Sequence, residues 1–291
     1  MARLHHGRDL WDRASAFAEA DSSAVVTQLG SWTAEKLFYV GSYLAQVTHT
    51  MTGNPRFPGG VIYVDPFCGN GICADKDSGK QFPGGALLAA HCRKQFRKLI
   101  MLDASSANVA ALQMRLHTAQ VASDLWLQVG DANNRMTDIV RQIPPRALTV
   151  AFLDPWSLGI HFSAIKVLAE SRRVDLLILF PDAMDIDRNV NQYYYSRKSD
   201  RLDLAMGDDG EWRTVWDEVR ERPAEARRQA MVEHYLNRLS NLGYRNYDAH
   251  AIGRGGAPLY RIVFASKDPL GLKLWKVAVS EDLYGQRSLF Q

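Results

Sequence analysis

The feature that most constrains the fold is the regular alternation of apolar and amphipathic segments between residues 61 and 180. The apolar segments are short and rich in β-branched and aromatic residues, which predicts buried strands, and the segments between them have helical spacing. The predicted strands span residues 61–65, 99–103, 125–129, 148–153 and 174–180. Because strands that alternate with helices pair in parallel, this region predicts a parallel sheet with helices on both faces.

A glycine turn follows the first predicted strand. Asp65 ends the strand, and the sequence then runs through Phe67 to Gly69 and Gly71. Glycine permits positive φ and lets a ligand approach the backbone closely. A carboxylate beside such a turn suits a ligand that carries a cation and hydroxyl groups but no phosphate. S-adenosylmethionine, with its ammonium, sulfonium and ribose, is therefore the first candidate cofactor. The alternative without function is a tight turn after a core strand.

The same turn also matches the pattern Gly-x-Gly-x-x-Ala of dinucleotide-binding proteins, through Gly69, Gly71 and Ala74. Two features count against a dinucleotide. Asp65 would repel a pyrophosphate. In addition, residues 74–80 are predicted to form a polar loop, whereas a dinucleotide needs a helix whose N-terminus binds the phosphates.

Carboxylates also follow the second and third predicted strands. Asp103 ends the second strand, where open α/β sheets commonly hold the ribose hydroxyls, and it is also placed to cap the next helix. Asp131 follows the third strand and either hydrogen-bonds an adenine amino group or caps the helix at 135–142. Together with Asp65, these acids at neighbouring strand ends predict one cofactor site at the carboxyl edge of the sheet.

The fourth predicted strand ends in Asp154-Pro155-Trp156. In an acceptor site, the Asp154 carboxylate and the Pro155 carbonyl would accept both hydrogens of an exocyclic base amine and draw its lone pair out of conjugation. Trp156 would stack on the base. Such positioning supplies much of the rate of a transfer reaction, and a base within a duplex would have to be flipped out. In the alternative, the proline only stops the strand and the tryptophan covers the edge of the core.

Beyond residue 180 the alternating pattern gives way to two helices and then a hairpin joined by glycines. The predicted elements are helices at 212–219 and 224–242, strands at 244–252 and 258–266, and a helix at 270–280. Five parallel strands followed by a hairpin is the order of a methyltransferase sheet. We therefore predict an α/β, Rossmann-like fold with a seven-stranded sheet of five parallel strands plus a C-terminal hairpin.

The predicted domain organisation has two parts. An N-terminal helical segment occupies residues 1–58, and a Rossmann-like methyltransferase domain occupies residues 59–291. A lid is inserted in this domain at about residues 182–210, where the sequence becomes polar, charged and rich in tyrosine.

Basic and aromatic residues form two candidate substrate contacts. In the predicted lid, Tyr193, Tyr194 and Arg197 are of the types that stack on bases and contact phosphates. The favoured alternative is a packed lid in which the tyrosines are half buried. Lys36, on a helix predicted at 32–50, would reach substrate or phosphate from the N-terminal segment. The favoured alternative for Lys36 is a solvated helix lysine.

Composition sets broad limits on compartment and partners. The chain of 291 residues is 46% hydrophobic and 23% charged, which is ordinary for a globular protein. No apolar run approaches the ~20 residues that cross a bilayer, and the first residues lack the apolar core of a secretory signal. Three cysteines favour a reducing compartment over a disulfide framework, and their spacing does not indicate a metal site. We therefore expect a cytoplasmic protein, and the net charge of +3 permits a nucleic-acid partner.

The sequence resembles the three-Cys-motif partner (TcmP) family over most of residues 31–190. The matching motifs are Trp32-Thr33-x-Glu35-Lys36, Asp65-x-Phe67-x-Gly69-x-Gly71, Gly84-Gly85-Ala86-Leu87-Leu88-Ala89, Leu153-Asp154-Pro155-Trp156 and Asp175-Leu176-Leu177-x-Leu179-Phe180-Pro181. The resemblance implies a class I methyltransferase-like fold and a protein partner with a cysteine motif, often phage-like and of radical-SAM type. Pro66 and Cys68 stand where the family more often has Gly and Ala, so this turn is closer to that of DNA amino-methyltransferases.

These features predict an S-adenosylmethionine-dependent methyltransferase that acts on nucleic acid, with an exocyclic base amine as the favoured acceptor. The predicted residues are Asp65, Phe67, Gly69, Gly71, Asp103 and Asp131 for the cofactor, Asp154, Pro155 and Trp156 for catalysis, and Lys36, Tyr193, Tyr194 and Arg197 for the substrate. Two other functions remain open. One is a non-catalytic, cofactor-binding partner of a radical-SAM-like protein, and the other is a nicotinamide-dependent oxidoreductase.

Overall fold

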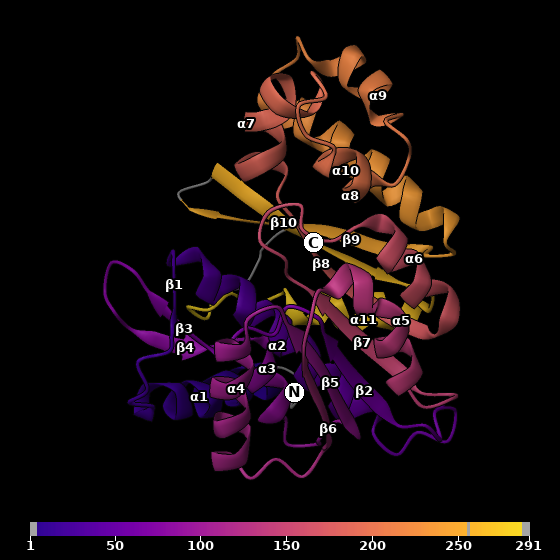
Figure 1. Ribbon diagram of the computed structural model, residues 1–291. Helices are drawn as coiled ribbons and strands as arrows, with labels where there is room; N and C mark the ends of the chain where they lie inside the picture. The colour runs from indigo at the N-terminus through magenta and orange to yellow at the C-terminus, as the bar shows by residue number, and fades with distance from the viewer. Residues whose placement is uncertain (1–4, 255–256, 287–291) are drawn as a thin grey trace.

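A mixed sheet of seven strands forms the centre of the molecule (Figure 1). The computed structural model describes residues 5–254 and 257–286. In spatial order the strands are β6 (Asp124–Val129), β5 (Lys98–Asp103), β2 (Val61–Asp65), β7 (Leu148–Leu153), β8 (Arg173–Phe180), β10 (Ala257–Ser266) and β9 (Asn246–Arg254). The first five pair in parallel, whereas β10 pairs antiparallel with both β8 and β9.

This strand order confirms the predicted Rossmann-like methyltransferase sheet. Within the large sheet, the strands follow the order third, second, first, fourth, fifth, seventh and sixth, with the seventh inserted antiparallel. The sequence patterns have a direct physical reason. Strands β2 and β7 are buried at every residue, so they are mainly apolar and have no solvent-exposed polar face.

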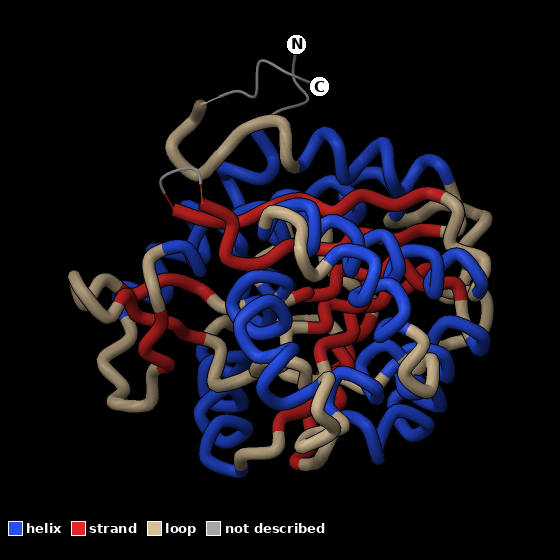
Figure 2. The backbone as a smooth tube through the Cα atoms, turned by 90° about the horizontal axis from the view of Figure 1, so that it is seen from above, coloured by secondary structure: helices blue, strands red, loops and turns tan. Residues whose placement is uncertain are grey.

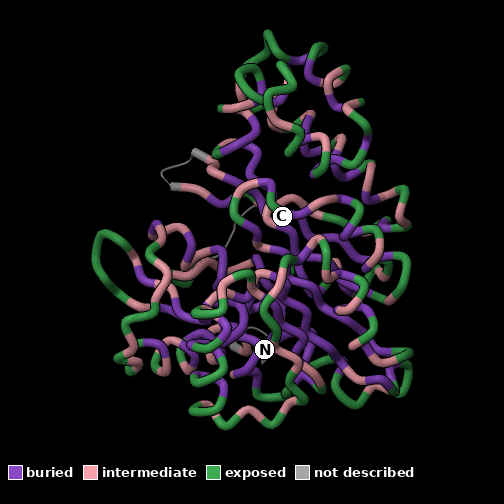
Figure 3. Tube along the Cα trace, viewed as in Figure 1, coloured by how far each residue is buried: buried purple, intermediate pink, exposed green. Residues whose placement is uncertain are grey.

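Helices cover both faces of the sheet (Figure 2). Those outside the insertion are α1 (His5–Ala20), α2 (Trp32–Met51), α3 (Gly85–Ala90), α4 (Ser106–Thr118), α5 (Ala132–Gln142), α6 (Phe162–Ser171) and α11 (Pro269–Ala278). Alternate residues of β2 point to opposite faces, so Tyr63 joins the core beneath α2 and α3, while Ile62 and Val64 join the core beneath α5 and α6. Figure 3 shows that the buried residues gather in the interior of the molecule and the exposed residues at its periphery.

A second, three-stranded sheet lies beside the glycine turn. It consists of β1 (Thr27–Leu29), β3 (Ile72–Asp75) and β4 (Gln81–Pro83), in the order β1-β3-β4. This corrects two expectations, because residues 74–80 begin in a strand and form the turn of a hairpin, and the N-terminal segment is not purely helical. All three strands are short, and the pairing of β1 with β3, which is distant in sequence, supplies hydrogen bonds that local sequence does not indicate.

The connection from β8 to β9 is a helical insertion, residues 182–241. It contains two short π-helices, η1 (Asp182–Ile186) and η2 (Val190–Tyr194), and the helices α7 (Asp187–Asn189), α8 (Arg201–Met206), α9 (Trp212–Val219) and α10 (Ala224–Asn241). Figure 1 shows α7 to α10 grouped together beyond β10. Trp212 and Trp216 are fully buried within the insertion, so it packs around apolar side chains of its own. Across the described residues, no helix has the length and apolarity that crossing a membrane requires.

Candidate functional site

The turn between β2 and β3 leaves the backbone of Gly69 open to a ligand. Gly69 and Gly71 adopt φ values of 59° and 87°, which favour glycine. A Cβ placed on Gly71 would lie 2.8 Å from Cδ1 of Leu112, whereas one placed on Gly69 would have no heavy atom within 4 Å. Packing therefore requires the glycine at 71, and the glycine at 69 borders space that a ligand can enter.

Asp65 is a buried carboxylate at the end of β2. Only 2% of its surface is exposed, and it accepts hydrogen bonds from the Tyr63 hydroxyl at 2.9 Å and the Phe67 amide at 3.1 Å. Burial raises the pKa of Asp65 to about 7, against the opposing effect of these hydrogen bonds. The nearby charges of Asp154 and Asp103 raise this pKa further. Three carboxylates from three strand ends therefore share one region.

Asp103, at the end of β5, holds the glycine turn in place. One of its carboxylate oxygens accepts a hydrogen bond from the Gly69 amide at 3.0 Å. The other accepts hydrogen bonds from the Ser105 amide at 2.9 Å and from Nδ2 of Asn108 at 3.0 Å. The side chain that caps α4 is Ser105, which accepts a hydrogen bond from the Asn108 amide. Asp103 thus connects the start of α4 to the one open glycine of the turn.

Asp131 caps a helix. It is the N-cap residue of α5 and accepts a hydrogen bond from the Asn134 amide at 3.0 Å. This confirms the capping interpretation. The side chain is exposed, and a contact with adenine stays a prediction.

Lys36 and Asp154 form an ion pair below the protein surface. Lys36 Nζ donates to Asp154 Oδ2 at 2.5 Å, and the two side chains are 7% and 19% exposed. The lysine also lies 5.7 Å from the centroid of the Tyr260 ring. The expectation of a solvated helix lysine was therefore wrong. Helix α2 packs against the sheet and turns Lys36 toward the end of β7.

The residues after Asp154 divide between the core and the solvent. Pro155 is buried, whereas Trp156 is 78% exposed and does not cover the core edge as the alternative interpretation required. Ser157 has a φ of 57° and donates a hydrogen bond to Asp185 in η1. This bond ties the loop after β7 to the helical insertion. Sequence reasoning missed Ser157 and Asp185, because no local pattern marks a contact between distant segments.

The three predicted substrate residues of the insertion have different environments. Tyr193 is 43% exposed, and Arg197 is exposed with a φ of 55°. Tyr194 is only 4% exposed, and its hydroxyl donates to Asp185 at 2.5 Å. Tyr194 therefore supports the insertion and presents no face on which a base can stack. Tyr193 and Arg197 remain available to a substrate.

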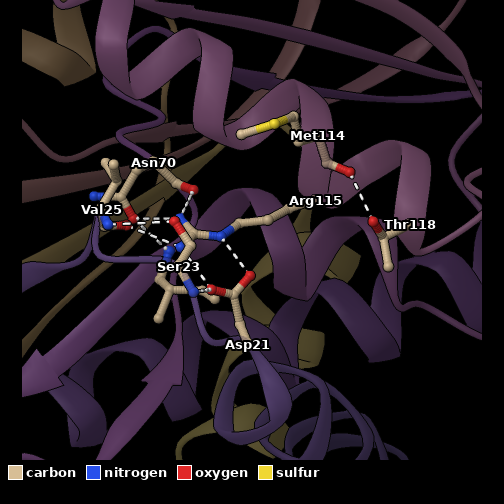
Figure 4. Close-up of polar contacts among 8 residues, drawn as sticks. Asp21, Ser23, Val25, Asn70, Met114, Arg115 and Thr118 are labelled. Carbon is tan, nitrogen blue, oxygen red and sulfur yellow. Dashed lines mark hydrogen bonds and ion pairs between the residues drawn. The ribbon is translucent and has the colours of Figure 1, made fainter.

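Arg115 supports the glycine turn through Asn70 (Figure 4). This residue of α4 is 3% exposed, and its Nη1 donates to the Asn70 carbonyl at 2.6 Å and to the Asn70 Oδ1 at 2.9 Å. Its Nε and Nη2 donate to Asp21 at 3.0 Å, and Nη2 also donates to the Val25 carbonyl at 2.9 Å. Sequence reasoning missed Arg115, since both partner segments are far away along the chain.

The residues at this edge fit S-adenosylmethionine better than a dinucleotide. The open backbone of Gly69 lies between the carboxylates of Asp65 and Asp103, which suits an ammonium and hydroxyl groups. The turn continues into β3, and the start of the six-residue helix α3 meets it through the Gly84 amide, which donates to the Gly71 carbonyl at 2.7 Å and is not free to bind a pyrophosphate. The two carboxylates therefore favour a cationic ligand without phosphate.

Comparisons with known proteins find only distant structural similarity. Neither a protein-family model nor a curated protein matches the sequence, so the TcmP resemblance stays a resemblance. A solved structure of LPL1258 from Legionella pneumophila, described with the family DUF519, is 10% identical, covers 81% of this chain and 89% of its own, and has a TM-score of 0.49. Trm1 from Pyrococcus horikoshii with S-adenosyl-L-methionine is 11% identical over 83% of this chain and 57% of its own, with a TM-score of 0.46. SMU.1697c from Streptococcus mutans, in complex with SAH, is 14% identical over 78% and 94%, with a TM-score of 0.38.

Proposed function

We propose that this protein is an S-adenosylmethionine-dependent methyltransferase whose acceptor is an exocyclic amine of a nucleic-acid base. The observation that carries the proposal is the position of Asp154 and the exposed Trp156 beside the carboxylates that flank the open glycine turn. This arrangement combines a cation-binding region with an aromatic face and a hydrogen-bond acceptor. Together these three features would hold a planar base with its amine beside the methyl donor.

The cofactor residues have separate tasks in this proposal. Asp65 would bind the ammonium of S-adenosylmethionine, the Gly69 backbone would contact it closely, and Asp103 would accept hydrogen bonds from the ribose. Asp131 would contact the adenine. When bound, the cofactor supplies an electrophilic methyl group on its sulfonium sulfur.

The acceptor residues act by positioning. Lys36 donates to Oδ2 of Asp154, and no hydrogen bond to Oδ1 is formed within the described residues. Oδ1 and the Pro155 carbonyl would accept the two amine hydrogens, so that the nitrogen lone pair points toward the methyl group. Trp156, 78% exposed, would stack on the base. Asp154 or water would take the proton that the amine nitrogen loses when it is methylated.

Two arms of one experiment test the proposal. Thermal unfolding with S-adenosylmethionine, S-adenosylhomocysteine and NAD should show stabilisation by the first two and none by NAD, because only ligands of the native state raise its stability. Transfer of a labelled methyl group to DNA and RNA should then be detected with the wild type. Asp154→Ala should abolish transfer and leave cofactor affinity nearly unchanged.

The outcomes separate the rival functions. Stabilisation by NAD alone would overturn the proposal in favour of an oxidoreductase. Cofactor binding without transfer, together with a stoichiometric protein that co-purifies, would favour the non-catalytic partner of a radical-SAM-like protein. The ion pair between Asp154 and Lys36 is a feature that fits the non-catalytic partner. The lysine already occupies one oxygen of the carboxylate that would otherwise contact an acceptor.

A further inference from the structure

An arginine-lined groove lies at the amino edge of the sheet, opposite the candidate methyl-transfer site. It has a volume of about 350 Å³ and is lined by Arg56, Phe57, Arg146 and Arg173. These residues precede or begin three adjacent strands, β2, β7 and β8. The strand register places Val61 beside Leu148 and Leu148 beside Arg173.

The loops that carry these arginines are tightly packed together. A Cβ placed on Gly59 would lie 2.4 Å from the Pro145 carbonyl oxygen and 2.7 Å from the Ala147 amide nitrogen. The Leu148 amide also donates to the Gly60 carbonyl at 3.0 Å. Arg56 and Arg146 are therefore held near one another by backbone contacts, and the groove does not depend on flexible tails.

The positive charge of the groove is little neutralised. Within the described residues, no carboxylate forms an ion pair with Arg146 or Arg173, and Arg56 meets only Asp268, at 3.5 Å between exposed side chains. Three further cations at this edge bond to uncharged oxygens. These are Arg97 to the Pro58 carbonyl, Lys98 to Gln142, and Arg172 to backbone carbonyls. Two acids belong to the strands near this edge: Asp124 is in register with Lys98, and the buried Asp175 follows Arg173 by two residues in β8.

These features indicate that the ligand of the groove is a polyanion and not a small nucleotide. Guanidinium groups bind phosphate oxygens through paired hydrogen bonds, and a row of unneutralised cations attracts successive phosphates. The one aromatic ring of the groove, Phe57, is 8% exposed and offers little surface for stacking on a base. The cations also extend along the edge past the groove itself, which an enclosed mononucleotide pocket would not need.

We propose that this groove is a second nucleic-acid contact, which binds the phosphate backbone without reading the bases. The site lies at the opposite edge of the sheet from Asp65 and Asp154. It therefore does not require that the protein transfers methyl groups. If the protein does so, the groove would hold a long substrate at a distance from the base that is modified.

Fluorescence anisotropy of a short labelled DNA duplex, measured without cofactor between about 50 and 200 mM salt, tests the groove. The double variant Arg146→Gln/Arg173→Gln should bind about tenfold more weakly at low salt. It should also lower the slope of log affinity against log salt by about 2, because each phosphate contact contributes about 0.9. Duplexes of unrelated sequence should lose affinity equally.

A matched control separates the groove from net charge. Lys80→Gln/Arg93→Gln removes the same charge from side chains that are 72% and 70% exposed and do not line the groove. The control should keep the wild-type slope. Arg146→Lys/Arg173→Lys, which preserves the charge, should retain most of the binding and shows whether loss reflects misfolding.

Three results would overturn the proposal. Equal losses in the groove and control variants would show a bulk charge effect. A wild type that does not bind the duplex would show that no such contact exists. A small-anion site would be identified if inorganic phosphate raised the thermal stability of the wild type but not of the groove variants, while all of them bound the duplex equally. The same duplex assay with Asp154→Ala distinguishes the two proposals, because loss of methyl transfer with intact groove-dependent binding would leave the groove standing.

Discussion

Lys36 and Asp154 are hydrogen-bonded at 2.5 Å although 118 residues separate them in the chain. Helix α2 supplies the lysine, and the end of β7 supplies the carboxylate. The pair fixes one oxygen of Asp154 and leaves the other for an acceptor. A helix outside the parallel sheet therefore sets the orientation of the proposed catalytic carboxylate.

Replacement of Lys36 by methionine should reduce both stability and activity. It leaves Asp154 unpaired in a largely buried site, so we expect the free energy of unfolding to fall by about 3 kcal/mol, the lower end for a broken buried pair. Methyl transfer should slow about 100-fold because the carboxylate loses its orientation. Urea unfolding and the transfer rate at saturating cofactor measure the two effects.

The double variant Lys36→Met/Asp154→Asn is the control for this pair. It removes the unpaired charge and should recover most of the lost stability, but none of the activity. A double variant as unstable as Lys36→Met would contradict the ion pair as the cause.

Trp156→Ala should raise the KM for the nucleic-acid acceptor and leave stability unchanged. The ring is 78% exposed, so its loss removes few contacts of the folded state. Stacking on a base is worth about 1–3 kcal/mol, which corresponds to an increase in KM of about 5- to 150-fold. Tyr284→Ala removes a ring that is 79% exposed elsewhere and should not change KM. An equal effect of both variants would argue against stacking on Trp156.

Ionisation of the buried Asp65 carboxyl should lower the free energy of unfolding as the pH rises from about 5 to 8. The pKa of Asp65 is about 7 in the folded protein, above the ordinary value near 4 of an unfolded chain. Its contribution to stability is therefore fully present below pH 4 and is lost as the pH rises through 7. Between pH 5 and 8 this loss amounts to about 2–3 kcal/mol.

Asp65→Asn isolates this effect from that of other groups. Burial also raises the pKa of Asp175, to about 6, so the wild type alone would report the two acids together. The difference in unfolding free energy between wild type and Asp65→Asn, measured by urea at several pH values, should change by the stated amount. A difference that is independent of pH would contradict the raised pKa.

Cofactor affinity should depend on the same proton. A ligand ammonium binds the ionised form of Asp65, so the affinity for S-adenosylmethionine should rise up to about tenfold per pH unit below pH 7 and level off above it. Isothermal titration calorimetry at several pH values checks this dependence. Asp65→Asn should bind weakly with no such rise, and an unchanged profile in this variant would place the ammonium elsewhere.

Arg115→Met should loosen the glycine turn. The arginine is 3% exposed and connects Asn70 to Asp21, so we expect a loss of about 3–5 kcal/mol in stability. Cofactor binding should weaken while the transfer rate at saturating cofactor changes little, because Arg115 acts through the turn. Arg115→Lys keeps the positive charge but cannot make all the hydrogen bonds of the guanidinium, so its affinity for the cofactor should be intermediate. A fall in the saturated rate alone would contradict a positioning role.

Much of the fold was predictable because its signals are local. Strands buried on both faces are mostly apolar, so β2, β7 and β8 stand out from the more polar sequence around them. Glycine at 69 and 71 marks the turn for a similarly local reason, since both residues adopt positive φ. The small sheet of β1, β3 and β4 was not predictable, because its three- and four-residue strands are stabilised by pairing across the chain.

The sequence by itself determined the strand order and the acids at the strand ends, since burial and chain alternation impose them residue by residue. Only the tertiary structure decided how those acids are used. From the sequence alone, Lys36 could have faced solvent and Tyr194 could have faced a substrate. The pattern of a helix or an insertion shows that it has an apolar side, but not which segment that side packs against. Docking buried both side chains against Asp154 and Asp185, and such long-range pairings depend on packing that no local pattern encodes.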